Sequence, residues 1–146
     1  MFDLRPAAES DYQFIWNLGK VTMHDYVDAI WGWDDAWQEN RFRSNFDPGN
    51  WDVIVAVSAV SGVDAGAIQV LTEPDEIYLS NIYLLPEWQG KGIGTLLVGL
   101  LIDRARASNV PLTLNVLKSN PRAKRLYERL GLTVVDESPE KFFMSS

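Results

Sequence analysis

Three glycines within five residues carry the strongest chemical signal in this sequence. Gly90, Gly92 and Gly94 stand in the segment QGKGIGT, directly before an apolar stretch with helical periodicity. Glycine costs about 1 kcal/mol relative to alanine inside regular structure, so a cluster at a helix entrance indicates that something approaches the bare backbone there. The first N–H groups of a helix have no partners within it, and the helix dipole makes this end positive. The segment therefore predicts an anion site.

Three phosphate-binding motifs compete for these glycines. The dinucleotide fingerprint G-x-G-x-x-G fails because neither register places a glycine at its third position. The Walker A loop fails because Lys91 is followed by Gly92 where serine or threonine is required. The pattern that remains is Q-x-x-G-x-G, spelled by Gln89, Gly92 and Gly94. Its structural alternative is a tight turn between a strand and a closely packed helix.

Composition restricts the class of protein. With 146 residues, of which 47% are hydrophobic, the chain can bury a core of its own, and we expect one domain over residues 1–146. It has no cysteine and one histidine, His24, which excludes disulfides, thiolate zinc sites, a cysteine nucleophile and multi-histidine metal sites, so we expect no metal. The net charge of −7 argues against nucleic-acid binding and favours a cationic partner.

The apolar stretches are too short to cross a membrane. They fall short of the roughly 18 residues that a span needs, and the first twenty residues lack the apolar core of a signal peptide. We therefore expect a soluble protein that does not insert into a membrane. The absence of cysteine fits a cytoplasmic location, although exported proteins without disulfides share this feature.

Periodicity and turn residues predict a mixed α/β fold. A strand over residues 2–7 precedes a helix that Ser10 and Gln13 would open as a capping box, and Gly32 ends this helix. A second helix begins with Asp34 or Asp35 as its N-cap and stops at the sequence Asp-Pro-Gly, residues 47–49. A β-hairpin over residues 51–71 follows, with a Ser-Gly turn at 61–62.

The second half of the chain continues as strand, helix, strand, helix and two strands. The third strand of the central block covers residues 76–85, and the fourth, over 112–117, follows through a parallel crossover. The helix between them carries one apolar stripe, formed by Ile93, Leu96, Leu97, Leu100 and Leu101. Asn120 caps the next helix and Gly131 ends it. The last strand, 141–144, is expected at a sheet edge, through which two subunits could pair as a homodimer.

Two ordered motifs in this half resemble the acetyl-CoA-binding core of the GNAT superfamily of N-acyltransferases. The first is Q-x-x-G-x-G, within NIYLLPEWQGKGIGTLLVGLLIDRARA. The second is N-x-x-A-x-x-x-Y-x-x-x-G, formed by Asn120, Ala123, Tyr127 and Gly131. The match covers about residues 81–132, a third of the chain. It implies a GNAT-type fold, a central mixed sheet flanked by helices, and acetyl-CoA (CoA) as co-substrate.

The resemblance also implies roles for individual residues. Asn120 would reach the cofactor, although a role as helix N-cap explains this residue equally well. Tyr127 would lie near the cofactor sulfur and donate a hydrogen bond to the departing thiolate. Its position on the apolar stripe of its helix also suits a tyrosine of the core. Gln89 would brace the glycine loop. The backbone at Ile82, Tyr83 and Leu84 would pair with the pantetheine arm, and the pyrophosphate would bind at Gly90, Lys91, Gly92, Ile93, Gly94 and Thr95.

The acceptor end carries no motif. Glu76 is our candidate general base, acting through water, with Glu73, Asp75 and His24 as alternatives. The segment MHDYVDAIWGWDDAWQENRF concentrates aromatic and acidic side chains that would suit a cation, with Tyr26, Trp31 and Trp33 as substrate candidates. The alternative is that these aromatic residues belong to the core and the acidic residues are caps or solvated.

Taken together, these features predict an N-acetyltransferase that transfers an acetyl group from acetyl-CoA to a primary amine by direct attack, since no cysteine can carry the acyl group. The acceptor would be a small molecule or a peptide. Two alternatives remain, a non-catalytic acyl-CoA-binding module or sensor with the same fold, and an unrelated nucleotide-binding domain.

Overall fold

The computed structural model describes residues 1–146, and the chain forms two compact units. Unit 1 comprises Met1–Gln69 and Asn81–Lys91, and unit 2 comprises Val70–Ser80 and Gly92–Ser146. The chain passes between the units three times, twice within strands and once between Lys91 and Gly92, and the organisation as one domain stays a prediction.

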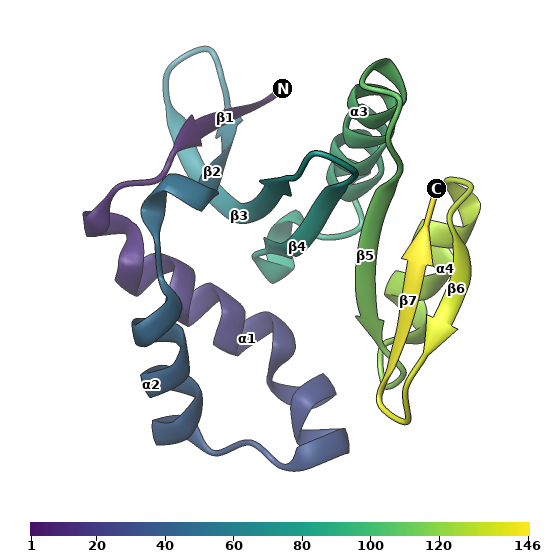
Figure 1. Ribbon diagram of the computed structural model, residues 1–146. Coiled ribbons are helices and arrows are strands. Elements are labelled where there is room, and N and C mark those ends of the chain that lie inside the picture. Colours follow the sequence, from purple (N-terminus) through teal and green to yellow (C-terminus); the bar gives the residue numbers. More distant parts are fainter. The chain divides into compact units, whose positions relative to one another are not determined.

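The order of the elements confirms the predicted mixed α/β class (Figure 1). Seven strands form one mixed sheet, and four α-helices accompany it. In chain order the elements are β1 (Phe2–Pro6), α1 (Tyr12–Trp31), α2 (Asp35–Asn45), β2 (Trp51–Val57), β3 (Gly62–Thr72), β4 (Ile77–Leu84), α3 (Ile93–Ala107), β5 (Leu112–Leu117), α4 (Pro121–Arg129), β6 (Thr133–Glu137) and β7 (Lys141–Ser145). The strand order is β1-β2-β3-β4-β5-β7-β6.

Unit 1 is built on antiparallel strands. β1 pairs with β2 and β2 pairs with β3, with a register shift between Ile54 and Val55 that marks a bulge. Helix α1 covers these strands through Ile15 and Leu18, which are fully buried against Trp51 of β2 and Ala67 of β3. Because Ile15 and Leu18 lie three residues apart, they share one face of the helix.

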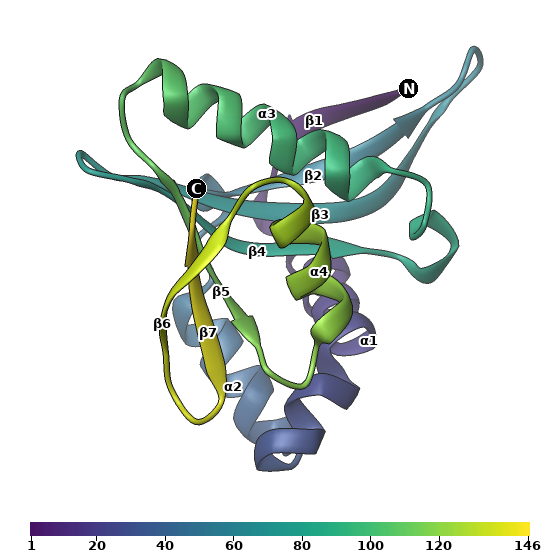
Figure 2. The same cartoon turned by 90° about the vertical axis from the view of Figure 1, so that its right-hand side faces the viewer.

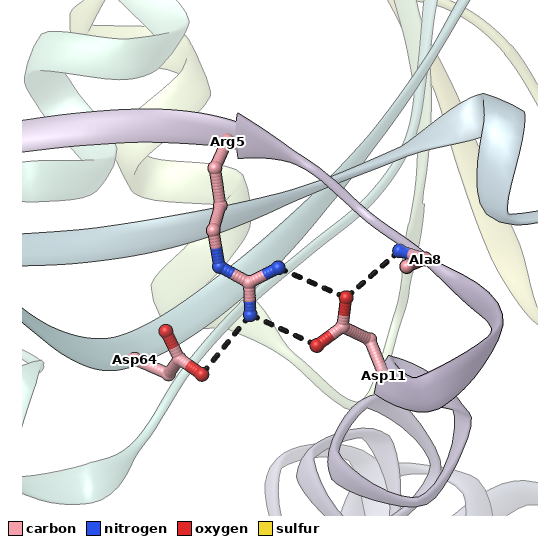
Figure 3. A network of polar contacts seen from close by, with 4 residues as sticks. All are labelled: Arg5, Ala8, Asp11 and Asp64. Atoms are coloured by element: carbon pink, nitrogen blue, oxygen red, sulfur yellow. Dashed lines mark hydrogen bonds and ion pairs between the residues drawn. The ribbon is translucent and has the colours of Figure 1, made fainter.

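The predicted capping box at the start of α1 is wrong. The side chain of Gln13 donates to Asn17 on the same helix, and the residue preceding α1 is Asp11, whose carboxylate accepts the Ala8 N–H at 2.8 Å. Asp11 is buried and paired with Arg5 of β1 (Figure 3). The ion pair with Arg5 therefore determines that Asp11 is the polar residue held directly before α1.

The break between the first two helices is confirmed. Gly32 ends α1 with φ of +76°, a conformation that favours glycine. The Asp34 carboxylate then accepts the Trp37 N–H at 3.0 Å, which makes Asp34 the N-cap of α2.

Unit 2 contains the parallel crossover and the C-terminal hairpin. β4 pairs with β5 in parallel, as expected. β7 pairs on one side with β5 and on the other with β6, and both views show it between these strands (Figures 1 and 2). The prediction that the last strand lies at an edge is therefore wrong, and β6 is the edge. A dimer built through β7 loses its basis.

Helix α3 buries a narrower stripe than expected. Ile93, Leu97 and Leu101 are buried as predicted, whereas Leu96 and Leu100 are 51% and 56% exposed. Val98 and Ala105 complete the buried face instead.

No helix is both long enough and apolar enough to span a membrane. No group of three or more histidine, cysteine, aspartate or glutamate side chains is arranged to hold a metal ion.

Candidate functional site

The glycine loop has the backbone conformation that the sequence pattern requires. Gly90 and Gly92 adopt φ of +73° and +82°, in the left-handed region where a side chain costs roughly 1–2 kcal/mol. Gly92 is the residue before α3, and its carbonyl accepts the Leu96 N–H at 3.0 Å. No side chain caps this helix end. The N–H groups of the first turn, from Ile93 to Thr95, therefore have no intrahelical partner.

Close packing does not explain Gly94. A Cβ added there would contact only Leu126 Cδ2 at 3.6 Å, an ordinary van der Waals distance, and its φ is not in the left-handed region. Alanine would fit and would favour the helix by about 1 kcal/mol. The alternative interpretation, a tight turn between a strand and a closely packed helix, accounts for Gly90 and Gly92 through their positive φ but does not account for Gly94.

The segment between β4 and the glycines is anchored within unit 1. The side chain of Gln89 donates from Nε2 to the Leu84 carbonyl at 2.9 Å, so Gln89 does brace the loop. The Trp88 N–H donates to the Leu85 carbonyl, and the Trp88 ring meets Phe2 edge to face at 6.2 Å. These contacts hold the strand end and the start of the loop together.

The two edges of β4 differ near its end. The Leu85 N–H donates to the Ala65 carbonyl of β3, and a Cβ added to Gly66 would clash with the Tyr83 carbonyl oxygen, so the backbone of Tyr83 faces β3. Backbone groups alternate along a strand, so Ile82 and Leu84 direct theirs to the opposite edge. Of the three residues expected to offer their backbone to pantetheine, Tyr83 does not face that edge, and the Leu84 carbonyl already accepts from Gln89.

The Tyr83 side chain belongs to a polar chain that the sequence did not predict. Its hydroxyl donates to Asn81 Oδ1 at 2.7 Å, and Asn81 Nδ2 donates to Gln69 Oε1 at 2.8 Å. The Tyr83 ring packs on Trp51 at 5.9 Å and against Gly19. Burial raises the pKa of Tyr83 well above its ordinary value, so the hydroxyl remains a neutral donor.

Two residues of the second motif, Asn120 and Tyr127, were expected to meet the cofactor; Asn120 directly precedes α4 and Tyr127 lies within it. Asn120 is the N-cap, because its Oδ1 accepts the Ala123 N–H at 3.2 Å, which confirms the structural role and leaves cofactor contact a prediction. Tyr127 is 8% exposed, and burial raises its pKa to about 12. Its hydroxyl therefore stays protonated over the whole range near neutral pH.

Glu76 lies directly before β4, and its carbonyl accepts the Glu73 N–H at 2.9 Å to close the turn. Its carboxylate is half-buried and accepts a hydrogen bond from Thr113 Oγ1 of β5 at 2.8 Å. Thr113 did not emerge from the sequence, because the two residues lie 37 positions apart and only the strand register joins them.

The acceptor candidates lie in the helical part of unit 1. Trp33 stacks on Trp16 at 6.2 Å and packs at a tilt against His24 at 5.1 Å, whereas Trp31 is 54% exposed and Tyr26 is half-buried.

The acidic residues of the same segment have structural roles. Asp28 accepts the Trp33 N–H, Asp34 caps α2, and Asp35 pairs with Lys20 at 2.7 Å and accepts from the Trp33 indole. These contacts account for most of the acidity without a ligand, so the cation pocket stays a prediction.

The candidate residues are divided between the units. Unit 1 holds Tyr26, Trp31, Trp33, the β4 residues Ile82–Leu84 and the start of the loop, Gln89–Lys91; unit 2 holds Glu76, the loop from Gly92 to Thr95, Asn120 and Tyr127. Among the candidate features, the glycine loop, residues 89–95, is the one that runs without a break along the chain from unit 1 into unit 2.

A curated relative matches part of the chain. This protein, the [ribosomal protein bS18]-alanine N-acetyltransferase of Haemophilus influenzae, is 46% identical over 63 residues. The match covers 42% of each chain, so the chain spans about two fifths of the length of the relative it matches.

Solved structures share the fold over the whole chain. The PaiA N-acetyltransferase of Thermoplasma acidophilum, in complex with coenzyme A, superposes with a TM-score of 0.71 at 18% identity, covering 100% of this chain and 98% of that one. The ribosomal-protein-S18-alanine N-acetyltransferase of Escherichia coli gives 0.68 at 22% identity, covering 99% and 92%.

A match to a protein-family model assigns the chain to a family. The model described as the acetyltransferase (GNAT) family matches residues 12–132, which include α1, the glycine loop and α4. The expectation drawn from the two short motifs is thereby confirmed over most of the sequence, and the chain belongs to the GNAT family of acetyltransferases.

Proposed function

We propose that the protein is an acetyl-CoA-dependent N-acetyltransferase that acetylates a primary amine by direct attack on the thioester. The observation that carries the proposal is the start of α3, where two left-handed glycines precede an uncapped helix N-terminus. Family membership and the coenzyme A bound in the Thermoplasma neighbour support the same cofactor for this chain.

The pyrophosphate of CoA would bind the N–H groups of this helix end. Those groups and the helix dipole stabilise an anion without any side-chain charge. Gly94 supports this interpretation because an alanine there would meet no obstacle in the protein itself. Its missing Cβ leaves room for the phosphates to approach the backbone.

The acceptor amine must be neutral when it attacks. An ordinary ammonium has a pKa near 10.4, so presenting the neutral amine at pH 7 costs about 4.6 kcal/mol. A base or a chain of waters would take that proton while the C–N bond forms and the C–S bond breaks. Glu76, the base suggested by the sequence, lies six residues before Ile82 along the extended strand β4, about 20 Å away, which is too far for transfer directly or through one water. A backbone N–H of β4 near Ile82 would polarise the carbonyl of the thioester.

Tyr127 would stabilise the departing thiolate by donating a hydrogen bond. A thiol has a pKa near 8.5, and the pKa of Tyr127 is about 12, so complete proton transfer to the sulfur would be uphill by roughly 5 kcal/mol. The hydroxyl therefore acts as a neutral donor, and the thiolate leaves as a hydrogen-bonded anion that solvent can protonate.

The acceptor class includes peptide amines. The Haemophilus relative is named for the N-acetylation of an alanine in a ribosomal protein. Peptides that begin with alanine are therefore the first acceptors to test, beside small amines.

The experiment is calorimetric titration of the protein with CoA, acetyl-CoA, ATP and NAD. Gly92→Glu places bulk and negative charge at the helix end, and we expect it to abolish CoA binding. The matched control is Gly32→Glu, because Gly32 has nearly the same φ, +76°, and no atom within 4 Å of an added Cβ. Both variants carry the same left-handed strain, so only Gly92→Glu should lose CoA.

Turnover separates the enzyme from a binding module. If the wild type binds CoA and releases free thiol from acetyl-CoA with an amine, the proposal holds. Tight CoA binding without thiol release across a broad amine panel would indicate the non-catalytic module, and binding of ATP or NAD instead of CoA would contradict the proposal outright.

A further inference from the structure

Three polar side chains of unit 1 form a chain of hydrogen bonds on strands β3 and β4. The Tyr83 hydroxyl donates to Asn81 Oδ1 at 2.7 Å, and Asn81 Nδ2 donates to Gln69 Oε1 at 2.8 Å. Gln69 is half-buried, and its Nε2 donates to no atom of the protein. The chain of hydrogen bonds therefore ends in a donor group that has no protein partner.

The three side chains lie on the face of the sheet that α1 covers. The register pairs Gln69 with Trp51, and paired residues of neighbouring strands direct their side chains to one face. Trp51 belongs to the core cluster that α1 closes. Asn81 and Tyr83 lie two residues apart on β4, and the Tyr83 ring packs on Trp51, so both share this face.

Packing alone does not require these residue types. Replacing every member of a hydrogen-bonded chain by apolar groups of the same shape is nearly neutral for stability. The polar chain instead fixes orientation, because Tyr83 stays a neutral donor and turns Oδ1 of Asn81 towards itself. Asn81 Nδ2 then binds Oε1 of Gln69, which leaves the two N–H bonds of Gln69 Nε2 for another acceptor.

The polar chain lies beside the part of β4 that the proposed mechanism uses. Asn81 and Tyr83 are the two neighbours of Ile82, whose N–H would polarise the thioester carbonyl, so their Cα atoms lie about 3.8 Å from that of Ile82. Gln69 lies on the neighbouring strand β3, and adjacent strands are about 4.8 Å apart. All three residues are therefore close to the carbon that the amine would attack.

We propose that Gln69 Nε2 donates a hydrogen bond to a carbonyl oxygen of the acceptor, and that Asn81 and Tyr83 are positioning residues for Gln69. The inference rests on the proposed function and narrows its acceptors to amines that carry a carbonyl group close to the nitrogen, as the first residues of a peptide do. Successive residues of an extended peptide advance by about 3.4 Å, so its first carbonyl oxygens span the short distance between Ile82 and Gln69. A simple alkylamine leaves the Gln69 donor without a partner.

Gln69→Met tests the donor, because methionine keeps the length and unbranched shape of the side chain and removes both N–H bonds. With a tripeptide that begins with alanine, we expect KM to rise roughly tenfold, since a typical hydrogen bond is worth about that factor. The value of kcat should stay nearly unchanged, because the lost contact belongs equally to the bound substrate and the transition state. With butylamine, neither constant should change. Gln13→Met, at an exposed glutamine that donates to Asn17, is the matched control.

Tyr83→Phe tests the positioning role, because it keeps the ring and removes the hydroxyl that orients Asn81. It should raise KM for the tripeptide by a smaller factor, and adding it to Gln69→Met should raise KM no further, because residues that act as one unit are not additive. The Kd for CoA, measured by calorimetry, should stay unchanged in every variant.

Three outcomes would overturn the inference and leave the proposed function standing. They are an unchanged KM for the tripeptide in Gln69→Met, equal losses with the tripeptide and butylamine, and a wild type that acetylates butylamine but no peptide. A wild type that binds CoA and releases no thiol with any amine would overturn the proposed function itself, and the role of Gln69 with it.

Discussion

The guanidinium of Arg5 donates two hydrogen bonds to the carboxylate of Asp11, at 3.0 Å from Nη1 and 2.9 Å from Nη2 (Figure 3). Nη2 also donates to Asp64 of β3 at 3.1 Å, and Asp11 accepts the Ala8 N–H. One arginine of β1 thus connects the start of α1 to β3 within unit 1. The two-bond geometry makes this pair stronger than an ordinary surface ion pair.

This geometry predicts that stability depends on the Asp11 charge. The hydrogen bonds from Arg5 hold the pKa of Asp11 below its ordinary value against the opposing effect of burial, and the Ala8 N–H acts in the same direction as Arg5. A depressed folded-state pKa gives stability that is present above the unfolded value, near 3.9, and is lost as the pH falls through the folded value. We expect Asp11→Asn to lower the free energy of unfolding at pH 7 by roughly 1–3 kcal/mol.

Chemical denaturation at pH 7 and at pH 3 measures this effect. The difference between wild type and Asp11→Asn should shrink on acidification, because the wild type loses the same charge. Asp64→Asn is the matched control, since Asp64 is 42% exposed and makes one bond, and it should cost less than about 1 kcal/mol. Equal losses in the two variants, or a difference independent of pH, would contradict the prediction.

Local signals in the sequence predicted the elements, and tertiary contacts decided the details that failed. Gly32 and Gly131 mark helix ends through their positive φ, which is a local property. The predicted capping box failed because the tertiary partner Arg5 selects Asp11 at the entrance of α1. Leu96 and Leu100 match the apolar period of α3 and are nevertheless exposed, because the surface that covers a helix decides how wide its buried stripe is.

The pairing of strands that lie far apart in the chain could not be predicted from the sequence either. The hairpin of β6 and β7 is readable from turn residues, but which of its strands joins β5 depends on pairs such as Leu114 with Met144. The contact of Glu76 with Thr113 depends on register in the same way. The glycine loop could be predicted because its residues are consecutive, whereas no motif or spacing in the sequence identifies a general base.

Gly94 should separate the stability of the fold from its function. A Cβ fits there, with Leu126 Cδ2 at 3.6 Å, so we expect Gly94→Ala to stabilise α3 by up to about 1 kcal/mol. The same methyl group would stand where the CoA phosphates approach, so the affinity for CoA should fall roughly tenfold or more. Thermal unfolding without ligand and calorimetric titration with CoA measure the two effects.

Gly99 provides the matched control in the same helix. No atom lies within 4 Å of a Cβ added to it, and it lies five residues after Gly94, beyond the first turn of α3 whose N–H groups have no intrahelical partner. Gly99→Ala should raise stability by a similar amount and leave the Kd for CoA unchanged. If Gly94→Ala bound CoA as tightly as Gly99→Ala, the phosphate interpretation of Gly94 would be wrong.

Tyr127→Phe tests the hydroxyl that the proposed mechanism uses. The ring is buried and stays in place, so CoA affinity should be unchanged, while kcat should fall about a hundredfold because the departing thiolate loses its donor.

Since the pKa of Tyr127 is about 12, its ionisation should not limit activity at any pH below about 11. A raised folded-state pKa also means that a contribution to the free energy of unfolding is present below pH 10 and is lost as the pH rises towards 12. The Tyr127→Phe variant should not show this loss of stability at alkaline pH.

Tyr12→Phe, whose ring packs on Phe42 and Phe46, is the control for kcat. An unchanged kcat in Tyr127→Phe would show that solvent alone stabilises the thiolate and that Tyr127 serves the core.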